Sequence, residues 1–500
     1  MSSVRKSQDN VSPSSQDDLV PNKTGLTLVG SSEVNNNVAY TEEEKKALVR
    51  KLDWHILPFI FWCYLFNSLD RNNISNAKSD GMTIDLNFPA NGYATMLTVF
   101  NVTFAGLGVP GVMLTRFVGP RWTIPGYMIG WGAMAMFNAA CKNFASVLVV
   151  RLLLGVFEAG FAASLIFYLT TFYTRGELGG RIAAFYSCQP LAGAFSGLLA
   201  YGVFQMDSAL KGWQILMLIE GAFTVAFAVL TAFMLPWSTD SAKFLSDREK
   251  EIARARILKD GSTATNTKFK PETFFQPLKD WKFYIFALIA ICYGVAATVA
   301  SNFLTQIIER FGYSTVKTNL YTVAPYACGA LVLALTAWSS DRFRERGLHL
   351  ASALVLVIIG CLLLACLPAS STGPAYFATF LITMGAYTPS CLFHTWHQCN
   401  EPSEDGRAFR VGMLTFLANT GTFVSANIFL DKWAPRYVIP LAVTCGVEAL
   451  ALVLVLGLRM YMTLDNRRRN KRQGVNWQSK DVPTEALVDG PANPSFRHFY

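Results

Sequence analysis

Charged side chains stand inside stretches of this sequence that are otherwise apolar, and they are the residues that could do chemistry. Asp70 and Arg71 directly follow one apolar run, and Arg151 and Glu158 lie within another. Ionisable groups inside a membrane are costly and usually mark a binding site or a pathway. A buried carboxyl group can carry a proton near neutral pH, and a guanidinium can hold an anion. The four residues therefore predict a site that handles a proton and an anion together.

The spacing of Arg151 and Glu158 decides how they can interact. Seven residues are close to two helical turns, so both side chains face the same way, about 10 Å apart. That separation is too long for an ion pair, so each group needs another partner or a substrate between them. The alternative is a structural ion pair with a neighbouring span, either Asp70–Arg151 or Arg71–Glu158, and the two arrangements can coexist.

The first apolar run is too short to cross a membrane by itself. Ile56–Leu69 has 14 residues, which is about 21 Å of helix against a hydrocarbon core of about 30 Å. We therefore predict that the helix continues to Ala77 and carries Asp70 and Arg71 into the outer part of the membrane. The alternative is that these two residues begin the first outer loop.

Other polar residues in apolar segments give weaker signals. Gln189 and Asn419 either line a cavity or bond only to neighbouring helices. His394 and His397 have a spacing that suggests a metal, but the sequence offers no matching carboxylate or Cys cluster. We therefore predict no metal site and expect imidazoles that line a cavity.

Membrane-spanning helices have to position these residues. Hydrophobic residues make up 52% of the 500-residue chain and charged residues only 15%, against about 25% in soluble domains. A span needs about 20 apolar residues. Twelve segments qualify, at about 54–77, 90–114, 122–140, 144–172, 179–203, 214–235, 281–306, 318–340, 348–368, 374–398, 407–430 and 437–461. We predict an all-α polytopic membrane protein whose twelve transmembrane helices form two six-helix bundles. We also expect close helix packing at Gly155, Gly160, Gly193 and Gly197.

Polar segments divide the chain. We predict a disordered cytosolic tail (1–40), an N-terminal six-helix bundle (41–235), a central cytosolic loop (236–280), a C-terminal six-helix bundle (281–461) and a cytosolic tail (462–500). On this topology Lys and Arg are concentrated in the cytosolic segments, which is the positive-inside pattern with both termini in the cytosol. The net charge of +9 is then a topology signal, and a nucleic-acid partner is excluded.

The sequence lacks the motifs of the common catalytic and cofactor sites. It has no glycine loop for a phosphate, no GxSxG elbow, no paired zinc motif and no haem motif. The longest segments outside the spans are too short for a nucleotide-binding domain. We therefore expect no enzyme and no cofactor, with energy taken from a proton gradient or from the substrate's own gradient. The expected partners are lipid, protons and a small organic anion, and we expect a functional monomer.

Several motifs resemble those of one transporter family. Lys51–Pro58, followed by Asn67–Ala77, is similar to the first span of major facilitator transporters of the anion:cation symporter family, which includes the fungal allantoate and nicotinate permeases. Arg151–Gly160 resembles the fourth span of that family. Further similar motifs are Gly212–Gly221, Trp338–Arg342 and, as in nicotinate-permease-like fungal members, the final Asn493–Tyr500.

The resemblance implies proton-coupled uptake of an organic anion by alternating access. In the family, the positions matched here by Asp70, Arg71, Arg151 and Glu158 form the core of anion binding and proton coupling. Gln189 matches a polar position in the middle of span 5. These are the same four charged residues that the cost of burying a charge in a membrane singles out.

Two positions depart from the superfamily pattern. Thr115 stands where the loop after span 2 normally carries a gating Asp, whereas the second copy of that motif keeps Asp341 and Arg342. Gln214 stands where an Arg is common after Gly-Trp. The gating role that the pattern implies is therefore carried over to Asp341 and Arg342 and not to the first half.

The leading hypothesis is a fungal plasma-membrane proton symporter for a small carboxylate such as nicotinate or allantoate. In it, Arg71 and Arg151 bind the carboxylate, and Glu158 and Asp70 carry the proton. The side chains that orient the substrate are Gln189, His394 and Asn419. The alternatives are a proton-driven exporter of a fungal metabolite, an anion sensor that signals without transport and, with least support, an intramembrane enzyme.

Overall fold

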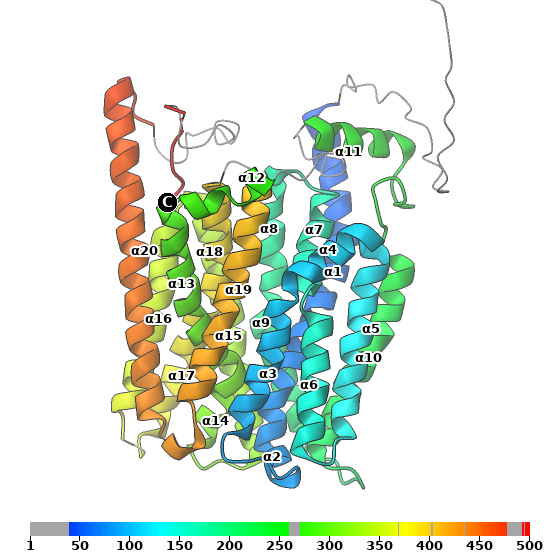
Figure 1. Ribbon diagram of the computed structural model, residues 1–500, viewed down its shortest axis with the longest axis vertical. Coiled ribbons are helices and arrows are strands. Elements are labelled where there is room, and N and C mark those ends of the chain that lie inside the picture. Colours follow the sequence, from blue (N-terminus) through cyan, green and yellow to red (C-terminus); the bar gives the residue numbers. More distant parts are fainter. Residues whose placement is uncertain are drawn as a thin grey trace, which may run out of the picture. The chain divides into compact units, whose positions relative to one another are not determined.

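Every regular element that the computed structural model describes is a helix (Figure 1). The described residues are 40–259, 271–368, 370–401, 404–434, 436–477, 493–494 and 496–500. Except for Tyr40, the predicted N-terminal tail lies outside them, as does part of the predicted central loop.

The first half of the chain contributes α1 to α10. The helix α1 (Glu42–Ser79) begins with a capping box between Thr41 and Glu44, and it runs unbroken past Asp70 and Arg71, as predicted. The helices that follow are α2 (Met82–Asp85), α3 (Gly92–Gly106), α4 (Gly108–Val118), α5 (Pro120–Ala139), α6 (Phe144–Glu158), α7 (Phe161–Thr170), α8 (Arg175–Tyr186), α9 (Cys188–Val203) and α10 (Gly212–Met234). Asp70 and Arg71 therefore lie in a helix and not in a loop.

The second half begins after a connection that contains α11 (Asp247–Lys259), α12 (Pro271–Phe274) and η1 (Gln276–Lys279). Its elements are α13 (Trp281–Thr298), the π-helical η2 (Val299–Phe303), α14 (Leu304–Glu309), α15 (Thr315–Phe343), α16 (Gly347–Cys366), α17 (Thr372–Ala386), α18 (Thr388–Cys399), α19 (Glu404–Ile428), η3 (Asp431–Trp433) and α20 (Val438–Gln473). The last helix, α20, continues into the segment predicted as a tail.

Several spans are built from two helices that only one or two residues separate. The pairs α3 and α4, α6 and α7, α8 and α9, and α17 and α18 are joined in this way, and α13 continues through η2 into α14. Counted as spans, the described residues hold six before α11 and six after it. Within the described ranges, seven helical stretches are long and apolar enough to cross a membrane by length and composition alone. Six spans on each side of α11 agree with the predicted fold class of twelve transmembrane helices in two six-helix bundles.

The most extensive contacts between the two halves are those of α9 with α15 and of α3 with α19. Glycines bring the first pair together. A methyl group added at Gly193 would lie 2.8 Å from the ring of Tyr326, and one at Gly197 would lie 2.5 Å from the hydroxyl oxygen of Thr322. The prediction that these two glycines allow close helix packing is confirmed.

The same device operates inside the first half. A methyl group added at Gly155 would lie 2.6 Å from the carbonyl oxygen of Phe100, and one at Gly160 would lie 2.6 Å from Cα of Gly111. Close packing at both glycines is therefore confirmed as well. The span of α6 and α7 lies main chain to main chain against that of α3 and α4, next to the point where α6 ends at Glu158.

Ion pairs tie α11 to the first half. Lys51 Nζ lies 2.8 Å from Glu249 Oε2, and Arg256 Nη1 lies 3.2 Å from Glu177 Oε1. Partial burial raises the pKa of Glu249, but hydrogen bonds from Lys51 and from the N–H and hydroxyl of Ser246 outweigh it, so this pKa lies below its ordinary value. Glu249 is therefore ionised at neutral pH, and its pair with Lys51 is kept.

The π-helical segment η2 offers main-chain carbonyl groups to neighbouring helices. Tyr326 of α15 donates its hydroxyl to the carbonyl oxygen of Ala300 (2.7 Å), and Tyr93 of α3 donates to that of Asn302 (3.0 Å). Single π-helical turns inside α-helices are frequent at functional sites. Here the irregular turn links helices from both halves of the molecule.

We predict that Gly193→Val destabilises the protein and that Gly202→Val does not. A valine at position 193 has to displace the ring of Tyr326 or push α9 away from α15, and overpacking of this kind costs about 1–3 kcal/mol. Gly202 is the matched control, because it lies in the same helix with no described atom within 4 Å of an added methyl group. The measurement is the thermal unfolding midpoint in detergent. Equal midpoints for the two variants would contradict the prediction.

Candidate functional site

Asp70 lies inside the first bundle, where α1 faces α5 and α10. Its Oδ2 accepts hydrogen bonds from Trp131 Nε1 of α5 (3.0 Å) and from Thr224 Oγ1 of α10 (2.9 Å). Its Oδ1 is buried with no hydrogen-bond partner among the described residues. Two uncharged donors therefore hold one oxygen of this carboxyl group, and the other oxygen is open to a proton.

Arg71 and Glu158 form an ion pair between α1 and α6. Arg71 Nε lies 2.7 Å from Glu158 Oε2. The guanidinium also lies over the rings of Phe104, 4.1 Å from the centroid, and Phe100, 5.7 Å from the centroid. The Glu158 side chain is fully buried, whereas 27% of the Arg71 side chain is exposed. The arginine is therefore the member of the pair that a second molecule can reach.

Arg151 stands two turns before Glu158 on α6 and is buried. Its Nε and Nη2 atoms have no hydrogen-bond partner in the part of the chain that the structure describes. Glu158 and Asp70 interact electrostatically with the guanidinium of Arg151, but neither is bonded to it among the described residues. Of the two ion pairs considered from the sequence, the described residues form Arg71–Glu158 and not Asp70–Arg151. A buried guanidinium with open N–H groups can bind an anion strongly, because little water competes for it.

Gln189 and His394 lie in a group of aromatic side chains between the two halves. Gln189 Nε2 donates to Tyr64 OH (3.0 Å). The ring of Tyr64 packs edge-on against Tyr186, whose ring is stacked with that of His394 from the other half, with 6.1 Å between centroids and 14° between planes. The group joins α1, α8, α9 and α18.

His394 and His397 form a hydrogen-bonded pair within α18. His394 Nδ1 lies 3.0 Å from His397 Nε2, and His394 Nε2 lies 3.5 Å from Tyr293 OH. Both imidazoles are buried. Nowhere among the described residues do three His, Cys, Asp or Glu side chains come together to hold a metal ion.

The remaining predicted residues are not bonded to this group in the described structure. Asn419 Nδ2 donates to the carbonyl oxygen of Thr415, one turn earlier in α19 (2.8 Å). Asp341, in the last turn of α15, forms an ion pair with Arg346, and Arg342 is exposed. These three residues therefore lie apart from the ion pair of α1 and α6 as far as direct bonds are concerned.

The position of the missing gating acid is occupied by an uncharged contact. Thr115 is fully buried, and its hydroxyl lies 2.6 Å from that of Ser164 in α7 and 3.3 Å from the carbonyl oxygen of Gly111. At this position the first half therefore has contacts between hydroxyl groups, whereas the second half has the ion pair of Asp341 and Arg346.

Hydrogen bonds join the two halves at the end of the bundles marked by α2 (Figure 1). Ser79, the last residue of α1, accepts from Asn319 Nδ2 at its hydroxyl (3.1 Å) and from Thr315 Oγ1 at its carbonyl (3.3 Å). Asn76 Oδ1 accepts from Thr305 Oγ1 (3.3 Å). These bonds fasten the end of α1 to α14 and α15, so the halves are held together at the α2 end.

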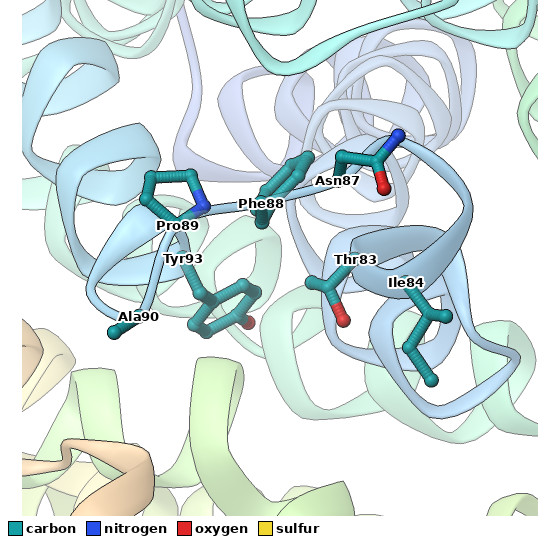
Figure 2. Close-up of a pocket in the computed structure, with 7 residues that line it drawn as sticks. All are labelled: Thr83, Ile84, Asn87, Phe88, Pro89, Ala90 and Tyr93. Atoms are coloured by element: carbon teal, nitrogen blue, oxygen red, sulfur yellow. The ribbon is translucent and has the colours of Figure 1, made fainter.

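A pocket of about 370 Å³ lies beside α2 (Figure 2). Its lining residues are Thr83, Ile84, Asn87, Phe88, Pro89, Ala90 and Tyr93. Asp70, Arg71, Arg151 and Glu158 do not line it. Because Tyr93 also bonds to η2, the pocket belongs to the α2 end of the contact between the halves.

Residues 60–426 match the family model described as Major Facilitator Superfamily, from within α1 to within α19. The chain belongs to the major facilitator superfamily. The predicted fold class, an all-α membrane protein with twelve helices in two bundles, is therefore confirmed.

Similar proteins of this superfamily come from fungi. The chain is 46% identical over 442 residues to the MFS-type transporter efuF of Hormonema carpetanum, covering 88% of this chain and 90% of the relative. It is 28% identical over 458 residues to the high-affinity nicotinic acid transporter of Saccharomyces cerevisiae, covering 91% and 85%. An inward-facing, occupied structure of a bacterial homologue of the human lysosomal transporter Spinster shares the fold, with a TM-score of 0.55 at 15% identity over 84% of this chain and 96% of that one.

These relatives establish the class of the protein. It is a multi-pass membrane transporter and not an enzyme, and the resemblance to fungal nicotinate-permease-like transporters is confirmed. Sequence reasoning did not find Trp131 and Thr224, the donors to Asp70, or the aromatic group around Tyr64 and Tyr186. The available signal was only that a buried aspartate needs donors, and it does not say which helix supplies them.

We predict that Thr224→Val destabilises this transporter more than Thr231→Val does. Both threonines are buried in α10, but Thr224 donates to Asp70 whereas Thr231 donates to a carbonyl of its own helix. Loss of a donor to a buried carboxyl group costs about 1–3 kcal/mol. Thermal unfolding of both variants and of Thr224→Ser, which keeps the hydroxyl, measures the difference. A Thr231→Val variant that unfolds as early as Thr224→Val would refute it.

Proposed function

We propose that this transporter is a proton-coupled symporter that takes up a small organic anion, a carboxylate such as nicotinate or allantoate. The observation that carries the proposal is the buried Arg151, whose Nε and Nη2 find no partner among the described residues, two turns from the Arg71–Glu158 pair. A guanidinium matches a carboxylate with two parallel hydrogen bonds. The name of the yeast nicotinic acid transporter supports the same substrate class.

The ion pair supplies a way to couple the anion to a proton. When a carboxylate binds the partly exposed Arg71, Glu158 loses its only ion-pair partner among the described residues. An unpaired carboxylate in an apolar interior is strongly disfavoured, so Glu158 takes up a proton. Asp70, with one open oxygen, is the second proton carrier of the proposal. Anion and proton then bind together, as symport requires.

The aromatic group favours a flat substrate. Tyr64 meets Tyr186 edge-on within the first half, and the ring of Tyr186 is stacked with that of His394 from the second half. Aromatic rings attract one another in offset or edge-on arrangements worth about 0.5–1.5 kcal/mol each. Nicotinate has such a ring and allantoate does not. In the proposal Gln189, His394 and, with fewer contacts to support it, Asn419 orient the substrate.

Alternating access assigns roles to the two ends of the molecule. In the proposal the protein resides in the plasma membrane with both termini in the cytosol, and the α2 end faces outward. The bonds of Ser79 and Asn76 to α14 and α15 are then the outer closure, which has to open to admit the anion. Asp341 and Arg342 lie at the cytosolic end of the second half and gate the exit.

Uptake by cells that express the protein tests the proposal. We expect saturable accumulation of labelled nicotinate that is faster at pH 5 than at pH 7 outside and that collapses with a protonophore. Allantoate, pantothenate and biotin are the competing substrates in the same assay. If the protein reaches the cell surface and none of the four accumulates, the uptake proposal fails, and efflux assays become the measurement.

We predict that Glu158→Gln abolishes accumulation driven by a pH gradient but leaves exchange of labelled for unlabelled anion measurable. The amide keeps the shape of the side chain and can no longer exchange a proton. Glu448→Gln is the matched control, because Glu448 is also a fully buried carboxyl group, in α20 of the other half, with no hydrogen-bond partner among the described residues. Unchanged accumulation by Glu158→Gln would remove Glu158 from the coupling mechanism.

A further inference from the structure

Residues 496–500 are buried against the second half of the transporter, although they belong to a segment predicted as a tail. Phe496 is 0% exposed, Arg497 1% and His498 2%. A tail that is attached to the molecule only through the last span is not expected to have side chains buried to this extent. The segment therefore occupies a defined place in the fold.

Two asparagines from different helices hold the main chain of this segment. Asn466 of α20 accepts from the N–H of His498 (2.8 Å) and donates to its carbonyl (2.8 Å). Asn400, directly after α18, accepts from the N–H of Phe499 (3.1 Å) and donates to its carbonyl (2.7 Å). Each amide thus satisfies both polar groups of one residue, as a neighbouring β-strand would.

Further bonds fix the segment to a third part of the bundle. Trp396 Nε1 of α18 donates to the carbonyl of Phe499 (2.9 Å), and the N–H of Arg346, in the turn between α15 and α16, donates to the carbonyl of Tyr500 (2.8 Å). The Arg497 guanidinium donates to Asn470 Oδ1 of α20 (2.7 Å). The segment therefore joins α18, α20 and the α15–α16 turn.

The parts that it joins are those that meet the first half or carry the gate. The helix α18 carries His394, which stacks on Tyr186 of α8 across the contact between the halves. Arg346 pairs with Asp341 and donates to Ser340 (3.0 Å). A change in the position of the segment would therefore alter both the contact of His394 with Tyr186 between the halves and the Asp341–Arg346 pair at the proposed gate.

We propose that residues 496–500 are a positioning segment for transport. By clamping the end of α18 and the α15–α16 turn to α20, they make these three elements move as one body when the halves rearrange. Without the segment, Asn400, Asn466 and the indole N–H of Trp396 lose their bonds to residues 498 and 499, and Asn400 keeps only its bond to the carbonyl of Trp396, so α18 is no longer tied to the segment at its end. The inference rests on the proposed transport of a carboxylate only for its activity readout.

Removal and replacement of the segment test the inference. A chain lacking residues 496–500, reconstituted in liposomes, should take up nicotinate at least about tenfold more slowly, the factor that corresponds to about 1.4 kcal/mol. A synthetic peptide with the sequence of residues 493–500, added on the side of the clamp, should restore most of the rate. Hydrogen exchange over residues 388–400 should rise in the shortened chain and fall again with the peptide.

Variants of the full chain separate positioning from general loss of structure. Asn400→Ala combined with Asn466→Ala should slow transport similarly and should not respond to the peptide, because the groups that receive it are gone. Asn427→Ala is the matched control, since Asn427 is exposed and donates to its own helix. If the shortened chain does not insert into the membrane, these full-length variants still test the inference.

The outcomes are distinguishable. Parent-like transport and parent-like hydrogen exchange over residues 388–400 in the shortened chain or in the double asparagine variant would overturn the inference. If the parent protein itself takes up no nicotinate, the proposed substrate fails, while peptide binding and hydrogen exchange still decide whether the segment positions α18.

Discussion

A charge in the hydrocarbon of a membrane needs a partner, and the charged residues of the first-half site are not all paired. Glu158 pairs with Arg71, and Asp70 accepts hydrogen bonds from two uncharged donors of α5 and α10. Among the described residues, two atoms of Arg151 have no hydrogen-bond partner. In the proposed transport, an incoming anion supplies the partner that Arg151 lacks. The outer helices α5 and α10 are needed to hold Asp70 in place, so the site involves the whole bundle.

Close packing occurs both inside the first half and between the two halves. Glycines bring the α6–α7 span onto α3 and α4, and they bring α9 of the first half onto α15 of the second, so these contacts leave no room for adjustment. The bonds between the halves at the α2 end are of another kind: single hydrogen bonds between small polar side chains such as Ser79 and Asn319. Bonds of this sort contribute about 0.5–1.5 kcal/mol each and exchange readily for water. The opening proposed for this end therefore breaks these bonds and also has to separate α9 from α15, which the glycines bring close together.

The sequence predicted most of the architecture and the charged residues, because both follow from the cost of placing groups in lipid. Apolar length determined the spans, and charge within them singled out Asp70, Arg71, Arg151 and Glu158. What it could not supply was pairing across distant positions. Trp131 and Thr224 are ordinary residues of their spans until folding brings them to Asp70. The docking of residues 496–500 was missed for the same reason, since the polar composition of the whole segment 462–500 outweighs the three aromatic residues at its end and does not show what they contact.

The irregular turn η2 determines the direction in which the side chains of α14, the next helix in the same span, point around the helix axis. Successive residues of an α-helix are about 100° apart, so one extra residue in a π-helical turn rotates the next segment by about that angle. Thr305, two residues beyond η2, points at Asn76 of α1 with this rotation included. In an uninterrupted α-helix the same threonine would face another neighbour. The contact between α1 and α14 is thus specified by the length of the turn before it as much as by the side chains that make it.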